Sequence, residues 1–218
     1  MSAVADKIMK RVRAKGRGWV FTPKHFIDFG TRGSVDMALS RLAQAGEVRR
    51  VGRGLYDYPK LHHKLGALTP DAQMIALAVS AQSGDQLAPS AATAANGLGL
   101  SAQISAKPSY ATTGRTRVRM AAGRSVALKH SRAPVLGNAS ETANGVVQLL
   151  ASLGRNKIDA DVIAHLSARL DDKDLAALLK GRLAMPGWMG DVVLRLNAHR
   201  RDAIDAIRGD KNRPVELA

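Results

Sequence analysis

Residues 33–59 have the sequence GSVDMALSRLAQAGEVRRVGRGLYDYP, an amphipathic segment followed directly by two short β-prone runs. The apolar residues of the first part recur at the spacing of one helical face: Val35, Ala38, Leu39 and Leu42. Ser34 is placed to cap the start of such a helix, and Gly46 is placed to end it. The pattern therefore predicts a helix from Ser34 to Ala45.

The second part of this stretch predicts a β-hairpin. Residues 47–51 and 55–58 are short β-prone runs, and Gly52-Arg53-Gly54 lies between them as a glycine-rich turn. Pro59 then ends the second run. A basic hairpin that follows a helix directly is the expected consequence.

The residues upstream complete a recognisable order of elements. Apolar residues at helical spacing predict a first helix over residues 2–15, and Trp19 to Phe21 predict a short strand. Thr22-Pro23 is placed as a helix cap followed by proline at the first helical position, which predicts a second, short helix. Helix, strand, helix, helix and hairpin is the order found in a winged helix-turn-helix. We expect residues 1–60 to form this DNA-binding domain.

The distribution of charge favours a polyanionic partner. The chain has 218 residues and a net charge of +15. Residues 1–64 contain 14 Lys or Arg and 5 Asp or Glu, whereas residues 136–218 contain 12 and 11. Clustered cations of this kind release counterions from nucleic acid on binding, although a generally basic protein surface has the same composition.

The candidate DNA-binding residues lie on the predicted third helix and on the hairpin. A helix in the major groove is expected to present Arg32, Ser34, Asp36, Arg41 and Gln44. The hairpin is expected to contact the phosphate backbone through Arg49, Arg50 and Arg53. Taken singly, each arginine is better explained as a solvated surface residue, and only the set in this order of elements favours DNA binding. Asp36 is equally well explained as an acid that favours the dipole of its helix.

The rest of the chain predicts a second, α+β domain over residues 69–209. It would contain a small antiparallel sheet built from runs near residues 110–113, 115–120 and 125–130, followed by four helices, with residues 210–218 as a frayed tail. Residues 60–68 are expected to be a linker. The middle run places three arginines at a period of two, on one face of a strand: Arg115, Arg117 and Arg119. This face is either a second nucleic-acid or partner surface or an exposed face of the sheet.

Composition and spacing favour no enzymatic, metal-binding or membrane role. The chain has no cysteine, and its six histidines do not fall into a metal-ligand spacing with one another or with carboxylates. No phosphate-binding loop or nucleophile motif occurs. There is neither a signal-peptide pattern nor an apolar run long enough to cross a membrane. We therefore expect a cytoplasmic protein without a cofactor and without catalytic residues.

The sequence also resembles a known family. The stretch over residues 33–59 is similar to the N-terminal winged helix of the AbiEi-like antitoxins, in which a helix that begins with Gly-Ser precedes an R-x-G-x-G-L-Y-x-Y-P wing. The similarity continues through PSAATAANGLGLSAQ at 89–103 and YATTGRTRVRMAAGRSVALKHSRAP at 110–134 to PGWM at 186–189.

The resemblance implies a type IV toxin–antitoxin regulator. Members of that family resemble transcriptional autorepressors that bind inverted repeats in their own promoter. They counteract a nucleotidyltransferase-like toxin without a stable complex being required. This implies that the helix from Ser34 and the wing around Arg53 contact duplex DNA. The alternative implied by the resemblance is an antitoxin whose main role is neutralisation of the toxin through the C-terminal domain.

Overall fold

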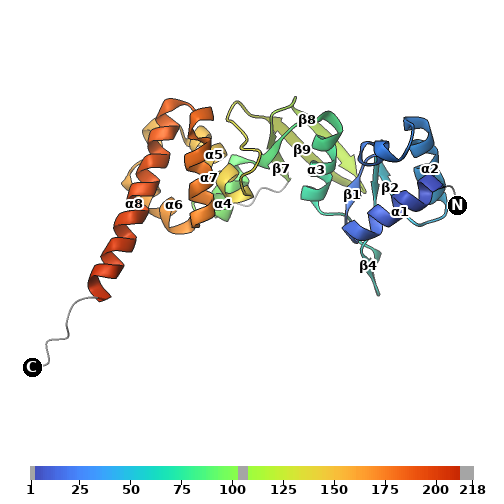
Figure 1. The fold of residues 1–218 in the computed structure, drawn as a ribbon, viewed down its shortest axis with the longest axis horizontal. Coiled ribbons are helices and arrows are strands. Elements are labelled where there is room, and N and C mark those ends of the chain that lie inside the picture. The colour runs from blue at the N-terminus through green and yellow to red at the C-terminus, as the bar shows by residue number, and fades with distance from the viewer. Residues whose placement is uncertain (1–2, 103–107, 212–218) are drawn as a thin grey trace, which may run out of the picture. The chain divides into compact units, whose positions relative to one another are not determined.

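The structure is a computed structural model that describes residues 3–102 and 108–211, with side chains to residue 205 (Figure 1). Contacts between Cα atoms divide the chain into two compact units. The first unit is Met1–Leu87 with Ala106–His130, and the second is Ala88–Ser105 with Ser131–Ala218. The chain is α+β with small sheets, as the sequence predicts, but the division differs from the predicted boundary at residue 69. Each unit is described separately below.

The first unit begins with helices and a small sheet. Its elements up to residue 67 are, in order, α1 (Ala3–Lys15), β1 (Val20–Phe21), the 3₁₀ helix η1 (Pro23–Phe29), α2 (Arg32–Gln44), β2 (Arg49–Gly52), β3 (Leu55–Asp57), β4 (Leu61–His62) and β5 (Gly66–Ala67). The three-stranded sheet has the order β1-β3-β2, and both pairings are antiparallel. The predicted helices, strand and hairpin of this region are therefore present. The predicted linker at residues 60–68 is wrong in part, because it contains the small antiparallel hairpin β4–β5.

One core joins α1, η1 and α2 to one face of this sheet. It includes the fully buried Ile8, Phe21, Phe26 and Leu39, with Tyr56 from β3. Phe21 and Phe26 pack edge to face, with ring centroids 5.4 Å apart. The apolar face predicted for α2 is therefore the face that anchors this helix.

A second core covers the other face of the same sheet. Val20 and Leu55 are buried together with Ile75 of α3 (Ala72–Ser83) and with Val126 and Leu128 of β9 (Arg124–His130). All three residues of β3 are consequently buried. This second core explains why α3 and the later strands belong to the first unit, because without them Val20 and Leu55 would be exposed to water.

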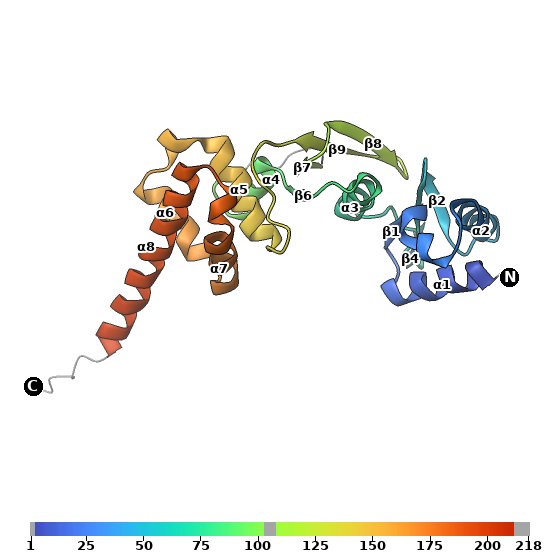
Figure 2. The ribbon, with the colours of Figure 1, turned by 45° about the horizontal axis from the view of Figure 1, so that its top comes forward.

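A third sheet, with four strands, is mixed. Its strands are β6 (Leu87–Pro89), β7 (Ser109–Thr112), β8 (Arg117–Ala121) and β9, in the order β6-β7-β9-β8. β8 and β9 form an antiparallel hairpin, but β7 and β9 run parallel. The expectation of an antiparallel sheet is therefore wrong for this pair. Figure 2 shows the β8–β9 hairpin beside β2, where the amide of Ala122 donates to the carbonyl oxygen of Val51 at 2.9 Å.

The second unit is helical. It contains α4 (Ala91–Gly97), α5 (Glu141–Leu153), the 3₁₀ helix η2 (Arg155–Lys157), α6 (Ala160–Arg169), α7 (Asp172–Gly181), the 3₁₀ helix η3 (Arg182–Ala184) and α8 (Gly187–Lys211). Ser90, Ser140, Asp159 and Asp171 cap four of these helices through their side chains. A single apolar core, with Leu150, Leu166 and Leu178 among its fully buried members, holds the helices together. The predicted tail at 210–218 is helical at Asp210 and Lys211, and its other residues lie outside the described part.

His25 gives the first unit a testable dependence on pH. The backbone amide of Thr22 donates to Nδ1 of His25 at 3.1 Å, at the start of η1. The pKa of His25 is lowered, mainly because the imidazole is buried. The positive charges of Arg11 and Lys15 lower it further, whereas a hydrogen bond with the Thr22 carbonyl raises it in part. The folded state therefore binds fewer protons than the unfolded state in the pH window between the lowered pKa of His25 and the ordinary histidine pKa of about 6.5. Stability is expected to fall as the pH decreases through this window.

The matched variant is His25→Gln, because a glutamine at this position of a helix start can still accept the Thr22 amide. We expect the free energy of unfolding of the native protein to fall more between about pH 7.5 and about pH 5.5 than that of His25→Gln. Denaturant titrations at the two pH values measure the difference. Equal slopes in the two proteins would show that His25 does not carry the dependence.

Candidate nucleic-acid interface

The outer face of α2 carries a continuous exposed stripe. Its members are Gly33, Met37, Ser40, Arg41 and Gln44. They follow the helical spacing of three and four residues, on the side away from the buried face of the helix. Within the residues that the structure describes, no hydrogen bond or ion pair engages the side chains of Arg41 and Gln44. Their donors are therefore available to a ligand.

The start of α2 differs from the prediction. Thr31, and not Ser34, caps the helix, because the Thr31 side chain accepts from the Ser34 amide at 3.3 Å. The Ser34 hydroxyl in turn donates to the Thr31 carbonyl oxygen at 2.8 Å. Ser34 is half-buried and lies inside the first turn. Its side chain is engaged in the helix start.

Two other predicted residues of this helix pair with each other. Nε of Arg32 donates to both carboxylate oxygens of Asp36, at 2.9 and 3.1 Å, one helical turn further on. Both side chains are half-exposed, so an ion pair of this kind contributes only about 0.3–0.5 kcal/mol. The first turn of α2 contains no acidic residue, and Asp36 lies beyond it. Its carboxylate therefore pairs with Arg32 and does not stabilise the helix start.

The three hairpin arginines have different environments. Arg49 donates to both carboxylate oxygens of Asp57, at 2.6 and 3.0 Å, and to the carbonyl oxygen of Leu68 at 2.7 Å. This contact raises the pKa of the Arg49 guanidinium. Arg50 is exposed on β2, and Arg53 is exposed in the two-residue turn between Gly52 and Leu55. Arg49 is thus bound inside the fold, while Arg50 and Arg53 face solvent.

The basic strand β8 is oriented differently from the prediction. Arg117 lies over α3, where it donates to Asp85 at 2.7 Å and to the Ser83 hydroxyl at 2.8 Å. Hydrogen bonds from Ser83 and then from Arg117 lower the pKa of the Asp85 carboxyl. Val118 is 57% exposed, although it would lie on the opposite face of the strand from the three arginines. The three arginines are therefore not equivalent: Arg115 and Arg119 are exposed, and Arg117 is an internal partner.

The hairpin turn and β8 meet at one cavity. Its volume is about 440 Å³, and its lining residues are Arg53, Leu55, Gln82, Val118, Arg119 and Met120. The amide of Gln82 on α3 donates to the carbonyl oxygen of Gly54 at 3.3 Å, which ties the turn to α3. Arg53 and Arg119, 66 positions apart in the sequence, therefore belong to one basic surface.

Sequence reasoning missed Met37 and Gln82. Met37 lies at helical spacing from Arg41 and Gln44, so the same periodicity that identified the polar face could have identified it. Met37 is 58% exposed, which is unusual for a large apolar side chain. Gln82 had no sequence signal, because its position beside Gly54 depends on how α3 packs.

Among the side chains described in residues 3–102 and 108–205, no group of three metal-ligating side chains is placed to bind a metal ion. No helix in these same ranges is both long and apolar enough to cross a lipid bilayer.

Comparison with known proteins gives a family but no function. No curated protein and no solved structure matches the chain. One family model matches it over residues 7–178, which includes the first unit from Lys7 of α1 onward and much of the second. The chain therefore belongs to DUF6088, a family of unknown function.

Proposed function

We propose that this protein is a sequence-specific, double-stranded DNA-binding transcriptional regulator, and that its first sixty residues act as a winged helix-turn-helix. The observation that carries this proposal is the exposed stripe on α2, where the side chains of Arg41 and Gln44 have no partner among the described residues. The order α1, β1, η1, α2 and the hairpin β2–β3 supports it. In this proposal α2 enters the major groove, and the hairpin is the wing.

The chemistry of the stripe suits the edges of base pairs. A guanidinium binds O6 and N7 of guanine with two hydrogen bonds, and a glutamine amide does the same at N6 and N7 of adenine. The exposed thioether of Met37 offers an apolar contact to a thymine methyl group. With 13 residues, α2 is about 20 Å long, enough to span several base pairs in the groove.

The basic surface around the wing suits phosphate groups. Arg53 and Arg119 line the same cavity, and Arg50 is exposed on the adjoining strand. Phosphate contacts of this kind position a protein on duplex DNA without distinguishing its sequence. We assign Arg49 and Arg117 a structural role instead, because Asp57 and Asp85 hold their guanidinium groups.

Selection from a random pool of duplexes, followed by titration of the selected site, tests the proposal. Replacing Arg53 with alanine should weaken binding to the selected site and to unrelated duplex by similar factors. The slope of log K against log salt concentration should become shallower by about 1, the effect of losing one phosphate contact. Arg119→Ala should behave in the same way. Fluorescence anisotropy at several salt concentrations measures both quantities.

Arg201→Ala on α8 is the matched control, because Arg201 is an exposed arginine of the second unit. It should leave the slope unchanged. The proposal of a sequence-specific regulator fails if the selection yields no preferred sequence, or if the protein binds the selected duplex no better than a random one.

We propose the antitoxin role as a second candidate, on the resemblance to AbiEi-like antitoxins. A cleft of about 270 Å³ between α7 and α8 is the observation that favours it, since Leu175, Leu179 and Ile204 give it an apolar lining suited to a helix of another protein. Inverted repeats in the protein's own promoter and an adjacent gene for a nucleotidyltransferase-like toxin would support this role. Rescue of cells by a full-length protein that cannot bind DNA would then separate neutralisation from repression.

A further inference from the structure

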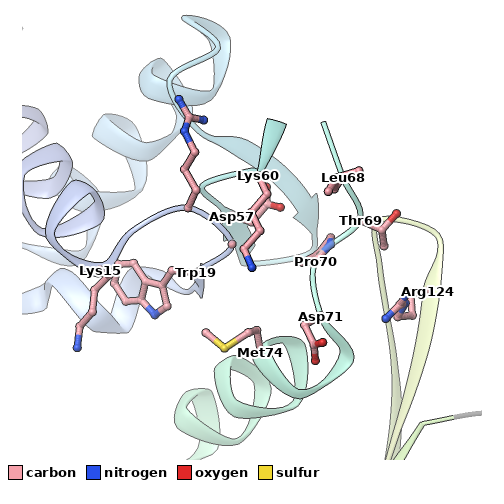
Figure 3. A pocket seen from close by; sticks show the side chains of 12 residues that line it. Lys15, Trp19, Asp57, Lys60, Leu68, Thr69, Pro70, Asp71, Met74 and Arg124 are labelled. Carbon is pink, nitrogen blue, oxygen red and sulfur yellow. The ribbon is translucent and has the colours of Figure 1, made fainter. Parts of the chain in front are cut away.

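The first unit contains a second cavity, which is separate from the stripe on α2 and from the wing turn. Its volume is about 400 Å³ (Figure 3). Its walls come from six parts of the first unit. These are the end of α1, residues 17–19 before β1, the end of β3 with Lys60, residues 68–71, the first part of α3 and the start of β9. No residue of α2 lines it, and neither Arg53 nor Arg119 does. The proposed DNA contacts therefore leave this cavity unexplained.

The cavity carries an excess of positive charge. Four cations line it, Lys15, Arg17, Lys60 and Arg124. Two carboxylates also lie in its wall: Asp57 is ion-paired with Arg49, whereas Asp71 accepts from the Gln73 amide at the start of α3 and keeps its negative charge. An anion that entered would meet four cations against the charge of Asp71, so the balance stays positive.

Three of these cations are available to a ligand. Arg17 donates to the Pro59 carbonyl oxygen at 2.9 Å and lies 4.6 Å from the centre of the Tyr58 ring. Within the described residues, no hydrogen bond or ion pair engages the side chains of Lys15, Lys60 and Arg124. Figure 3 shows the Lys15 ammonium extending away from the cavity, whereas Lys60 and Arg124 lie on either side of it, so these two are placed to meet a small anion.

The backbone at Gly18 makes room for one of these cations. Gly18 has a φ of +95°, and a Cβ there would lie 2.7 Å from Cε of Lys60. The Gly18 amide also donates to the Tyr58 carbonyl oxygen at 2.6 Å, which holds the two segments together. The stem of Lys60 therefore passes directly over the glycine, and its ammonium group extends toward Trp19 and Pro70 (Figure 3).

The remaining wall is apolar. Trp19, Leu68, Pro70 and Met74 line it, and the Met74 thioether points toward the Trp19 indole in Figure 3. Trp19 is held from behind by Phe21 and Phe26, at centroid distances of 4.9 and 5.9 Å. A rigid aromatic ring beside a polarizable thioether is a suitable surface for a flat organic ring.

From these features we propose that this cavity binds a small organic phosphate that carries a flat ring, a ligand of the nucleotide class. Lys60 and Arg124 hold the phosphate, and Trp19 and Met74 pack against the ring. A volume of about 400 Å³ lies within the usual range for sites of small molecules. This site is independent of DNA binding.

Titration of the full chain with nucleoside monophosphates, without DNA, tests the proposal. The Trp188→Phe background leaves Trp19 as the only tryptophan, so a change in fluorescence reports on this cavity. We expect at least one of the adenosine, guanosine, cytidine and uridine monophosphates to bind at or below a Kd on the order of 1 mM. The corresponding nucleoside without phosphate should bind at least about tenfold more weakly, because it lacks the charge-assisted hydrogen bonds.

The double variant Lys60→Gln with Arg124→Gln should lower the affinity by about tenfold or more. Lys24→Gln with Arg132→Gln removes the same charge from exposed positions outside the cavity and should change the affinity by less than about twofold. Circular dichroism verifies that both variants are folded. Three results would overturn the proposal. The first is that no monophosphate changes the Trp19 fluorescence, and the second is that both double variants lose affinity equally. The third is that duplex DNA displaces the ligand and that the affinity for DNA depends on Lys60 and Arg124 as strongly as on Arg53. Failure to find a DNA site would leave this result unaffected.

Discussion

Arg41→Ala is expected to lower the affinity for the selected operator by about tenfold to a hundredfold, while the affinity for random duplex changes much less. A bidentate contact between an arginine and a guanine contributes about 1–3 kcal/mol of discrimination between bases. Arg41 lies on the exposed stripe of α2 and has no partner within the described residues, so its loss leaves the fold unchanged. Anisotropy titrations with both duplexes give the ratio of the two affinities, which is the quantity that should fall.

Arg32→Ala is the matched comparison on the same helix. Arg32 is similarly exposed, but Asp36 holds its Nε and neutralises its charge. We therefore expect a smaller loss of discrimination than for Arg41→Ala. Met37→Ala should reduce binding mainly at sites with a thymine under the helix. If Arg41→Ala weakens both duplexes by the same factor, α2 is not the element that distinguishes sequences.

The helix and the hairpin of the first unit could be predicted because their signals are local. The apolar spacing of residues 35–42 specifies one helical face, and the glycines at 52 and 54 specify a tight turn. Even here the helix begins two residues earlier than predicted, because Thr31 provides the cap. Ser34 and Thr31 are chemically equivalent as caps, so only the geometry of the backbone decides between them.

The partners of the basic residues could not be predicted, because they depend on packing between distant elements. Arg117 and Asp85 are 32 positions apart, and they meet only because β8 pairs with β9 above α3. The same packing leaves Val118 exposed, against its alternation in the sequence. The parallel pairing of β7 with β9 likewise requires knowledge of the connection between them. Composition therefore identified a basic surface, but not which of its arginines are free.

The cavity at Trp19 had no signal in the sequence for a related reason. Its cations come from Lys15, Lys60 and Arg124, and none of the local patterns around these residues differs from an ordinary solvated surface. The absence of a side chain at Gly18 leaves room for the Lys60 side chain over the backbone, and this requirement depends on how the two segments pack. Sites formed between elements become visible only once the elements are packed.

The ion pair between Arg49 and Asp57 should make Arg49 one of the most sensitive surface positions of the first unit. The Asp57 side chain is 1% exposed and that of Arg49 is 31% exposed. Arg49→Met would leave a buried carboxylate without its partner, which costs about 3 kcal/mol or more of unfolding free energy. Asp57→Asn should cost less, about 1–2 kcal/mol, because the amide oxygen can still accept from Arg49 and the guanidinium retains water and the Leu68 carbonyl.

The double variant tests whether Arg49 and Asp57 stabilise the fold as an ion pair or contribute independently to the free energy of unfolding. Arg49→Met with Asp57→Asn removes the buried charge together with its partner, so it should be more stable than Arg49→Met alone. Denaturant titrations that follow Trp19 in the Trp188→Phe background report on the first unit, where two-state unfolding can be checked against circular dichroism. A loss below about 1 kcal/mol for Arg49→Met, or a double variant less stable than that single variant, would contradict this account. Arg49 would then be free to contact DNA, as the sequence alone predicts. A guanidinium that Asp57 holds for stability is not available to a phosphate group, so the two roles exclude each other.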